Sequence, residues 1–172
     1  TTLSYKITGK EVERKVNLKI SIIPSGLYIN VRTNNDVLYD DVEALLNDMV
    51  QGADGIPYKC ISQGSSLMMY CKVFEGSKVG DGNTYRITVT AFDAVDNSDG
   101  EIEDWDDIGI SETEDLKEQI ESNIGISVTF PTEGIKMIKI STTNEMGEPK
   151  DFYKYVYVKK LETYCDWYND ER

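Results

Sequence analysis

Apolar and polar residues alternate in several separate stretches of this chain, and this pattern limits its fold more than any other feature. In the first stretch, Leu18, Ile20 and Ile22 are separated by Lys19 and Ser21. The same alternation returns at 27–31, 85–90 and 135–143. A period of two is the pattern of a β-strand with one face buried against a core. The chain is therefore predicted to be mainly β.

A turn signal, Pro24-Ser25-Gly26, lies between the first two alternating stretches. Proline and glycine favour a chain reversal at such a position. Residues 18–31 are therefore predicted to form a β-hairpin. Further strands are expected at 58–61, 67–74, 126–130 and 152–160.

One helix is expected near 41–51. Apolar residues recur there at helical spacing and form one stripe: Val42, Leu45, Leu46, Met49 and Val50. Asp40 is placed to cap the start of this helix, with Glu43 three residues later, and Gly52 to end it. A stripe of this width predicts a helix packed on a sheet.

The glycine-rich stretch Gly76–Asn83 is the candidate domain boundary. It is polar, and no helix is expected after it, so it is interpreted as a linker or turn and not as a phosphate-binding loop. Two folding units are predicted, a β-rich N-terminal domain at 1–80 and a second domain at 81–160. Residues 161–172 form an aromatic tail.

The negative charge is concentrated in one segment. The net charge is −13, yet residues 93–121 hold thirteen acids and a single base, Lys117, and the other residues hold eighteen acids and seventeen bases. Direct nucleic-acid binding is disfavoured, because it needs a basic surface. Within this acidic insertion, 96–124, the capping pattern Ser111–Glu114 and the spacing of Leu116, Ile120 and Ile124 predict a short helix.

The composition excludes several kinds of function. The chain has no histidine, which removes the commonest general base and metal ligand, so an enzyme is not expected. No apolar run approaches the roughly 20 residues that cross a bilayer. Residues 1–10 lack the apolar segment of a secretory signal, so we expect that a signal has been removed or that the standard export route is not used.

Three cysteines are too few for a disulfide framework. Cys60 and Cys71 are expected to face each other across a hairpin that turns at Gly64-Ser65-Ser66. Two unbonded thiols are favoured there over a disulfide, and Cys165 in the tail is expected to be free.

Short stretches in the second half of the chain carry the most specific pattern: Phe92-Asp93-Ala94, Asp96-Asn97-Ser98-Asp99-Gly100 and Trp105-Asp106. They resemble the first half of a PKD domain, an immunoglobulin-like β-sandwich. The second half of a PKD domain is resembled by the spacing of Gly134, Asn144 and Gly147. Alternating apolar residues lie before Asn144 and after Gly147. The resemblance covers about residues 83–160, and it implies two sheets sharing one core, with Trp105 buried between them.

The sequence departs from this family at several points. Asp107-Ile108-Gly109-Ile110 replaces the usual Phe-Gly-Asp-Gly, and Lys136 stands where an aromatic residue is usual. Some PKD-like domains hold calcium near the acidic turn, and here Asp96, Asp99 and Asp104 could supply the oxygens. A solvated acidic loop without bound metal is the simpler expectation, and no other cofactor is expected.

The expected function is that of a non-enzymatic structural or adhesive module. The expected setting is a bacteriophage virion, as a capsid, neck or tail decoration that contacts other virion or surface proteins within an oligomeric assembly. Tyr164, Trp167 and Tyr168 in the tail are candidate interface residues. Two alternatives stay open: an acidic decoy that mimics the charge of DNA, and a secreted carbohydrate-binding module at the cell surface.

Overall fold

The computed structural model describes residues 2–6, 13–17, 26–75, 83–117, 125–144 and 146–160. In chain order the strands are β1 (Thr2–Lys6), β2 (Glu13–Asn17), β3 (Leu27–Thr33), β4 (Cys60–Ser62), β5 (Ser66–Glu75), β6 (Thr84–Asp96), β7 (Ile102–Lys117), β8 (Ile126–Thr129), β9 (Gly134–Thr143) and β10 (Pro149–Lys159). The helical elements are α1 (Val42–Gln51) and the short 3₁₀ turn η1 (Ala53–Gly55). The prediction of a mainly β chain with one α-helix is confirmed for these residues.

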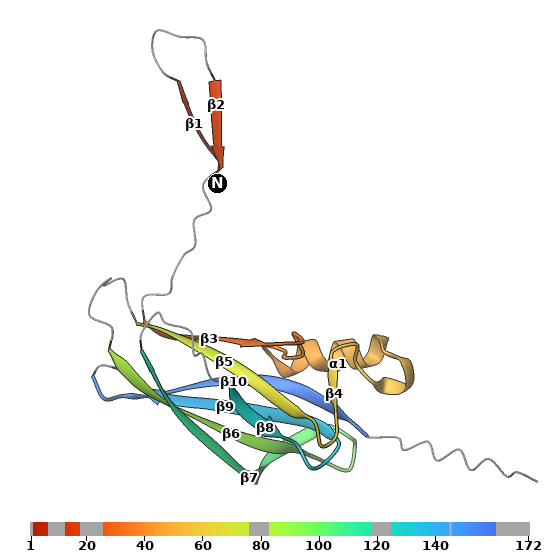
Figure 1. Ribbon diagram of the computed structural model, residues 1–172. Coiled ribbons are helices and arrows are strands. Elements are labelled where there is room, and N and C mark those ends of the chain that lie inside the picture. Colours follow the sequence, from red (N-terminus) through yellow and green to blue (C-terminus); the bar gives the residue numbers. More distant parts are fainter. Residues whose placement is uncertain are drawn as a thin grey trace, which may run out of the picture.

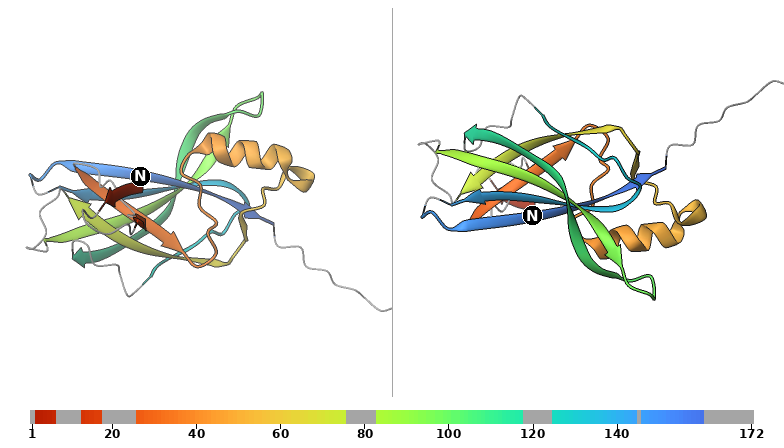
Figure 2. Two further views of the ribbon diagram at one scale, coloured as in Figure 1. Left: turned by 90° about the horizontal axis from the view of Figure 1, so that it is seen from above. Right: turned by 90° about the horizontal axis from the view of Figure 1, so that it is seen from below.

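Two sheets lie on either side of one apolar core. A five-stranded sheet has the order β4-β10-β9-β6-β7, and a three-stranded sheet has the order β3-β5-β8. Figure 1 shows β3 and β5 above β6, β9 and β10, and Figure 2 shows the two layers from above and below. Strand β4 runs parallel to β10, and the other neighbouring strands of both sheets are antiparallel. Strands β1 and β2 pair with each other in a separate two-stranded sheet.

The alternating residues of the central strands build the core. In β6, Tyr85, Ile87, Val89 and Ala91 are buried, and the residues between them are exposed or half-buried. Buried residues from both sheets join them in one cluster. Burial of this apolar surface is the main stabilising contribution to such a fold.

The predicted division into two folding units is not seen in the described residues. Strands from both sides of Gly76–Asn83 share both sheets: β5 pairs with β8, and β4 pairs with β10. The core cluster likewise runs from Ile29 to Val158. Residues 83–160 supply only β8 to the three-stranded sheet, so they do not build both layers of an immunoglobulin-like sandwich by themselves. Glycine-rich composition is typical of turns as well as of linkers between domains, so composition alone does not identify a domain boundary.

The predicted helix is present, with its start shifted by one residue. Asp41, not Asp40, caps α1, and its Oδ1 accepts a hydrogen bond from Ala44 N at 2.7 Å. Gly52 ends the helix as predicted. A side chain at this position would meet the carbonyl oxygen of Ile56 at 1.8 Å, so only glycine fits.

Two local predictions from the first half are corrected or lie outside the described residues. Residues 18–25 are not described, so the hairpin predicted over 18–31 is tested only by β3, whose described partner is β5. The turn at Gly64-Ser65-Ser66 joins β4 in one sheet to β5 in the other and is not a hairpin. Cys60 and Cys71 both carry free thiols, as was favoured.

The helix predicted after Ser111 is wrong for the residues that are described there. Residues 102–117 form the long strand β7, and Glu112 and Glu114 pair with Val89 and Ile87 of β6. Hydrogen bonding to β6 outweighs the local helix signal, because propensity is a weak contribution beside tertiary pairing. Residues 118–124 lie outside the described residues.

Candidate protein-binding surface

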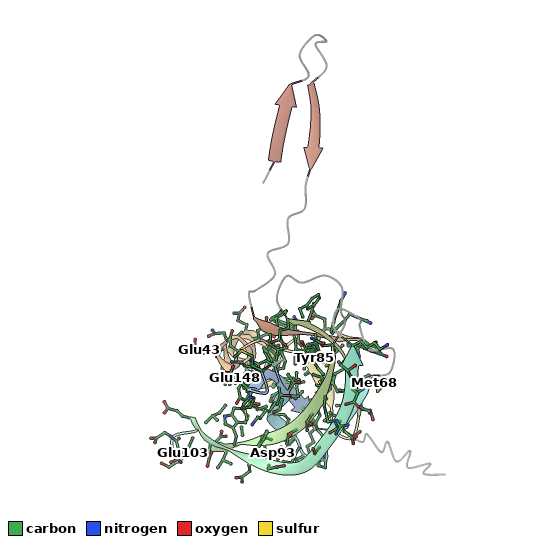
Figure 3. All side chains as sticks on the ribbon, turned by 90° about the vertical axis from the view of Figure 1, so that its left-hand side faces the viewer. Glu43, Met68, Tyr85, Asp93, Glu103 and Glu148 are labelled. Carbon is green, nitrogen blue, oxygen red and sulfur yellow. The ribbon has the colours of Figure 1, made fainter. Side chains whose placement is uncertain are left out.

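The hairpin of β6 and β7 continues beyond the part that covers the core. The pairing of β6 with β7 shifts register between Ala91 and Phe92. At this point β7 contains two additional residues, Ile108 and Gly109. Gly109 has a positive φ of 74°, and its N–H donates to Asp107 Oδ1 at 2.8 Å. A bulge of this kind bends and twists a hairpin. We call residues 92–107 the distal hairpin; Figure 3 shows Glu103 at its far end, away from the core residue Tyr85.

The tip of the distal hairpin is fixed by one asparagine. Asn97 Oδ1 accepts hydrogen bonds from the N–H groups of Asp99 and Glu101 at 2.9 and 3.0 Å. The backbone N–H of Asn97 donates a hydrogen bond to the Glu101 carbonyl oxygen at 2.8 Å, and the N–H of Gly100 donates to the Asn97 carbonyl oxygen at 3.1 Å. Gly100 has a φ of 79°, a conformation that glycine adopts without strain. The acidic tip is therefore an ordered turn.

Trp105 holds the distal hairpin against the rest of the molecule. Its ring centroid lies 5.7 Å from that of Tyr155 in β10, at an interplanar angle of 48°. Trp105 is half-buried, so the prediction that it fills the core between the sheets is wrong. Trp105 pairs with Ala94 of β6. Asp93 faces inward, because it contacts the buried Lys136. Neighbouring residues of a strand point to opposite faces, so Ala94 and Trp105 point outward. Trp105 is a contact on the outer face of the five-stranded sheet.

Seven carboxylates of the distal hairpin are exposed: Asp96, Asp99, Glu101, Glu103, Asp104, Asp106 and Asp107. None of the ion pairs formed among the described residues includes any of them. Nearer the core, Asp115 lies 2.9 Å from Arg86. The hydrogen bond to Arg86 lowers the pKa of Asp115, and the same contact raises the pKa of Arg86. Exposed carboxylates without an ion-pair partner are thus concentrated on the distal hairpin, although others, such as Glu43 and Asp54, lie elsewhere.

The predicted calcium ligands do not form a site. Across the described ranges, no group of three or more cysteine, aspartate or glutamate side chains could hold a metal ion. Asp96, Asp99 and Asp104 are all exposed, and Asp104 Oδ1 accepts a hydrogen bond from Trp105 N at 2.8 Å. Calcium needs six to eight oxygens around one point, and the hairpin does not gather these three carboxylates around one.

A buried lysine lies at the point where the distal hairpin leaves the core. Lys136 is 1% exposed, and its Nζ lies 2.7 Å from Asp93 Oδ1. Asp93 Oδ1 accepts no hydrogen bond, so this contact is an ion pair. Nζ also donates to Thr132 Oγ1 and to the Glu133 carbonyl oxygen at 2.7 and 2.8 Å, and Thr132 donates to Asp93 Oδ2 at 2.8 Å. A single lysine at an inward position of β9 was the sequence signal for this network.

A second polar cluster joins α1 to the edge of the five-stranded sheet. Tyr39 exchanges two backbone hydrogen bonds with Tyr155, at 2.8 and 3.0 Å. The Tyr39 hydroxyl donates to Asp48 of α1, and burial together with this carboxylate raises the pKa of Tyr39. Lys154 forms an ion pair with Asp40. These contacts anchor the helix to β10.

The two described thiols differ in burial: Cys71 is buried and Cys60 is half-buried. Burial raises the pKa of Cys71 to about 12, with a smaller contribution from the nearby Glu114 charge. A cavity of about 300 Å³ lies beside Cys60 and is lined partly by Asn34, Asn35 and Lys159. Among the described residues that line it, none is a carboxylate.

The candidate interface residues Tyr164, Trp167 and Tyr168, and also Cys165, lie outside the described residues. Within the ranges that are described, no helix is long and apolar enough to cross a membrane.

Comparison with known proteins finds a distant structural neighbour but no matching family model. No family model matches the sequence, and no curated protein matches it. Among solved structures, the sporulation control protein Spo0M from Bacillus subtilis is similar at a TM-score of 0.42 and 11% sequence identity. The match covers 78% of this chain and 49% of that chain, so this chain spans about half the length of that neighbour. A likeness at this level carries no argument about fold or function.

Proposed function

We propose that this protein is a non-enzymatic binding module that contacts a basic partner protein through the distal hairpin. The observation that carries this proposal is the set of seven exposed carboxylates without an ion-pair partner on one ordered hairpin. Two unit charges about 10 Å apart in water repel each other by roughly 0.4 kcal/mol. A basic partner replaces this repulsion with attraction.

The backbone of β7 adds a second feature that suits a protein partner. Strand β7 is at the edge of the five-stranded sheet, with β6 on its only paired side among the described strands. The other side of an edge strand offers N–H and C=O groups to an added strand. The partner chemistry that fits both features is an extended segment rich in lysine or arginine.

Two wider hypotheses remain predictions. The bacteriophage virion is the setting that we propose for such a module, and it rests on the resemblance to PKD domains alone. The acidic decoy is the second candidate, because uncompensated carboxylates also suit a basic nucleic-acid enzyme. The concentration of exposed carboxylates on one hairpin favours contact with a short segment over mimicry of a long DNA surface.

Binding to a synthetic lysine-rich peptide, measured by calorimetry at low and at high salt, tests the proposal. The test variant neutralises three carboxylates of the distal hairpin, Glu101→Gln, Glu103→Gln and Asp106→Asn. The control neutralises three exposed acids elsewhere, Glu43→Gln, Asp54→Asn and Glu133→Gln. We expect the test variant to lose affinity and salt dependence and the control to keep most of both. Equal losses in the two variants would show that net charge alone is responsible, and the proposal would be wrong.

A further inference from the structure

The outer face of the three-stranded sheet carries two cations and, among the residues of its strands, no acid. Arg32 of β3 and Lys72 of β5 point away from the core, because their neighbours Thr33 and Cys71 are buried. The other outward residues of β3, β5 and β8 are aromatic, aliphatic or uncharged polar ones. In a chain with a net charge of −13, a sheet face of this composition is a distinct surface. We call the outward residues of these three strands the basic face.

The two cations of the basic face are held in place by aromatic rings. The guanidinium carbon of Arg32 lies 4.8 Å from the ring centroid of Tyr70, and Lys72 Nζ lies 5.2 Å from that of Phe74. The Tyr70 ring lies against Gly125, where a side chain would come within 3.3 Å of it. A cation–π contact positions a side chain without neutralising its charge.

The strand register fixes the spacing of the two cations. Arg32 pairs with Tyr70, and Lys72 is two residues further along β5, so Arg32 and Lys72 are diagonal neighbours. Such neighbours are about 7–8 Å apart. Lys72 forms no ion pair with any residue that the structure describes. The basic face therefore presents positive charge at a defined spacing.

The distal hairpin carries carboxylates at a similar spacing. Asp104 and Asp106 are two residues apart in β7, so their side chains lie on the same side of the strand, roughly 6.6 Å apart. Trp105 between them contacts Tyr155, so the two carboxylates point away from that contact. Both are exposed, and neither forms an ion pair within the described ranges. The hairpin is thus complementary to the basic face in charge and in spacing.

The distal hairpin and the basic face of one molecule do not meet. Figure 3 shows Glu103 of the hairpin and Met68 of the basic face on opposite sides of the molecule. The Trp105–Tyr155 contact holds the hairpin at the five-stranded sheet, whereas the basic face belongs to the other sheet. These two surfaces can therefore be joined only between two copies of the chain.

We propose that the distal hairpin of one molecule binds the basic face of a second copy, with Asp104 and Asp106 opposite Arg32 and Lys72. This inference rests on the proposed function, since it gives the hairpin a basic partner. The net charge of −13 opposes association at long range, but salt at physiological concentration screens charges that are more than about 8 Å apart. Ion pairs at the contact are closer than this distance. Because the two surfaces differ, such a contact extends into a ring or a chain of molecules.

Sedimentation velocity at increasing protein concentration, at about 0.15 M salt, tests the contact in the whole chain. The face variant is Arg32→Glu/Lys72→Glu, and the hairpin variant is Asp104→Lys/Asp106→Lys. We expect the parent to sediment faster as its concentration rises and each variant to stay monomeric. An equimolar mixture of the two variants should associate again, because the acidic face of one then meets the basic hairpin of the other.

A control variant separates the basic face from the overall charge. Lys159→Glu/Lys160→Glu makes the same change of charge as the face variant, at two exposed cations elsewhere, and should associate as the parent does. Circular dichroism verifies the fold of each variant. A parent that stays monomeric, a control that loses association as the face variant does, or a mixture that stays monomeric would each overturn the proposal.

The lysine-rich peptide separates this inference from the proposed function. The face variant keeps the distal hairpin and should still bind the peptide. If the parent and the face variant bind the peptide but the parent does not associate, only the contact between copies is wrong. If neither binds the peptide, the proposed function itself fails.

Discussion

The two halves of the β6–β7 hairpin share the same antiparallel backbone pairing but differ in the burial and the ion pairing of their side chains. In the core half, residues 84–91 and 110–117, every second residue of β6 is buried and Asp115 is paired with Arg86. In the distal hairpin no residue is fully buried, and seven carboxylates have no ion-pair partner. The boundary is the bulge after Ala91. One pair of strands thus contributes to the core at one end and carries the proposed binding surface at the other.

The largest expected effect separates the two halves by truncation of one apolar side chain in each. Ile87 is fully buried in the core half, and Val95 is half-buried in the distal hairpin. Ile87→Ala should lower the free energy of unfolding by roughly 2–5 kcal/mol, and Val95→Ala by less than about 1 kcal/mol. Urea denaturation measures both. Similar losses at the two sites would show that the distal hairpin is part of the cooperative core.

The ion pair at the boundary should have the next largest effect. Asp93→Ala leaves the ammonium of Lys136 buried without its carboxylate, and the loss of a partner by a buried polar group costs roughly 1–3 kcal/mol. The double variant Asp93→Leu/Lys136→Met removes both charges and should be more stable than Asp93→Ala in the same urea measurement. A double variant less stable than the single one would contradict this account of the network.

Trp105 sharpens the comparison, because it is the contact between the distal hairpin and β10. Trp105→Ala should cost about 1–2 kcal/mol, less than a fully buried tryptophan would. It should also make the hairpin more susceptible to limited proteolysis. A loss of unfolding free energy as large as that of Ile87→Ala would show that Trp105 is a core residue, against this account.

A smaller and pH-dependent effect is expected at Asp115. Its pKa is lowered by Arg86, so the ion pair contributes stability above the ordinary carboxyl pKa of 3.8 and loses it as pH falls through the lowered value. Asp115→Asn should therefore be slightly less stable than the parent at pH 6, and the difference should shrink as the pH falls below 3.8. A difference that persists in acid would point to packing instead of charge.

Calcium is expected to have no effect. Since no three carboxylates converge within the described part of the chain, millimolar calcium should leave the melting temperature of the protein equal to that of a chelated sample. If calcium raises the melting temperature and Asp99→Asn abolishes that rise, the distal hairpin does bind calcium and this expectation is wrong.

Local periodicity was enough to predict β3, β6 and α1. The alternation at 27–31 and 85–90 reflects burial on one face, and the same burial is present in β3 and β6. The stripe from Val42 to Val50 likewise predicted α1. These features depend on neighbours in sequence, which a pattern records directly.

The features that failed depend on contacts between distant residues. Nothing near Ser62 indicates that β4 joins Lys159 in a parallel pair, so the chain was divided into two units. The helix signal at Ser111 ignores the pairing of β7 with β6. The acidic segment was evident from composition, but its separation into paired and unpaired carboxylates follows from the position of Arg86 and from the bulge at Gly109.

Residue-resolved NMR titration with the lysine-rich peptide tests the central claim most directly. The account predicts that the amide signals of residues 96–107 shift most, that the core half shifts little, and that salt reverses the changes. The cavity beside Cys60 serves as the internal control, since it is lined by Lys159 and by no carboxylate. Shifts centred on that cavity, or spread evenly over all exposed acids, would contradict the assignment of the distal hairpin as the binding surface.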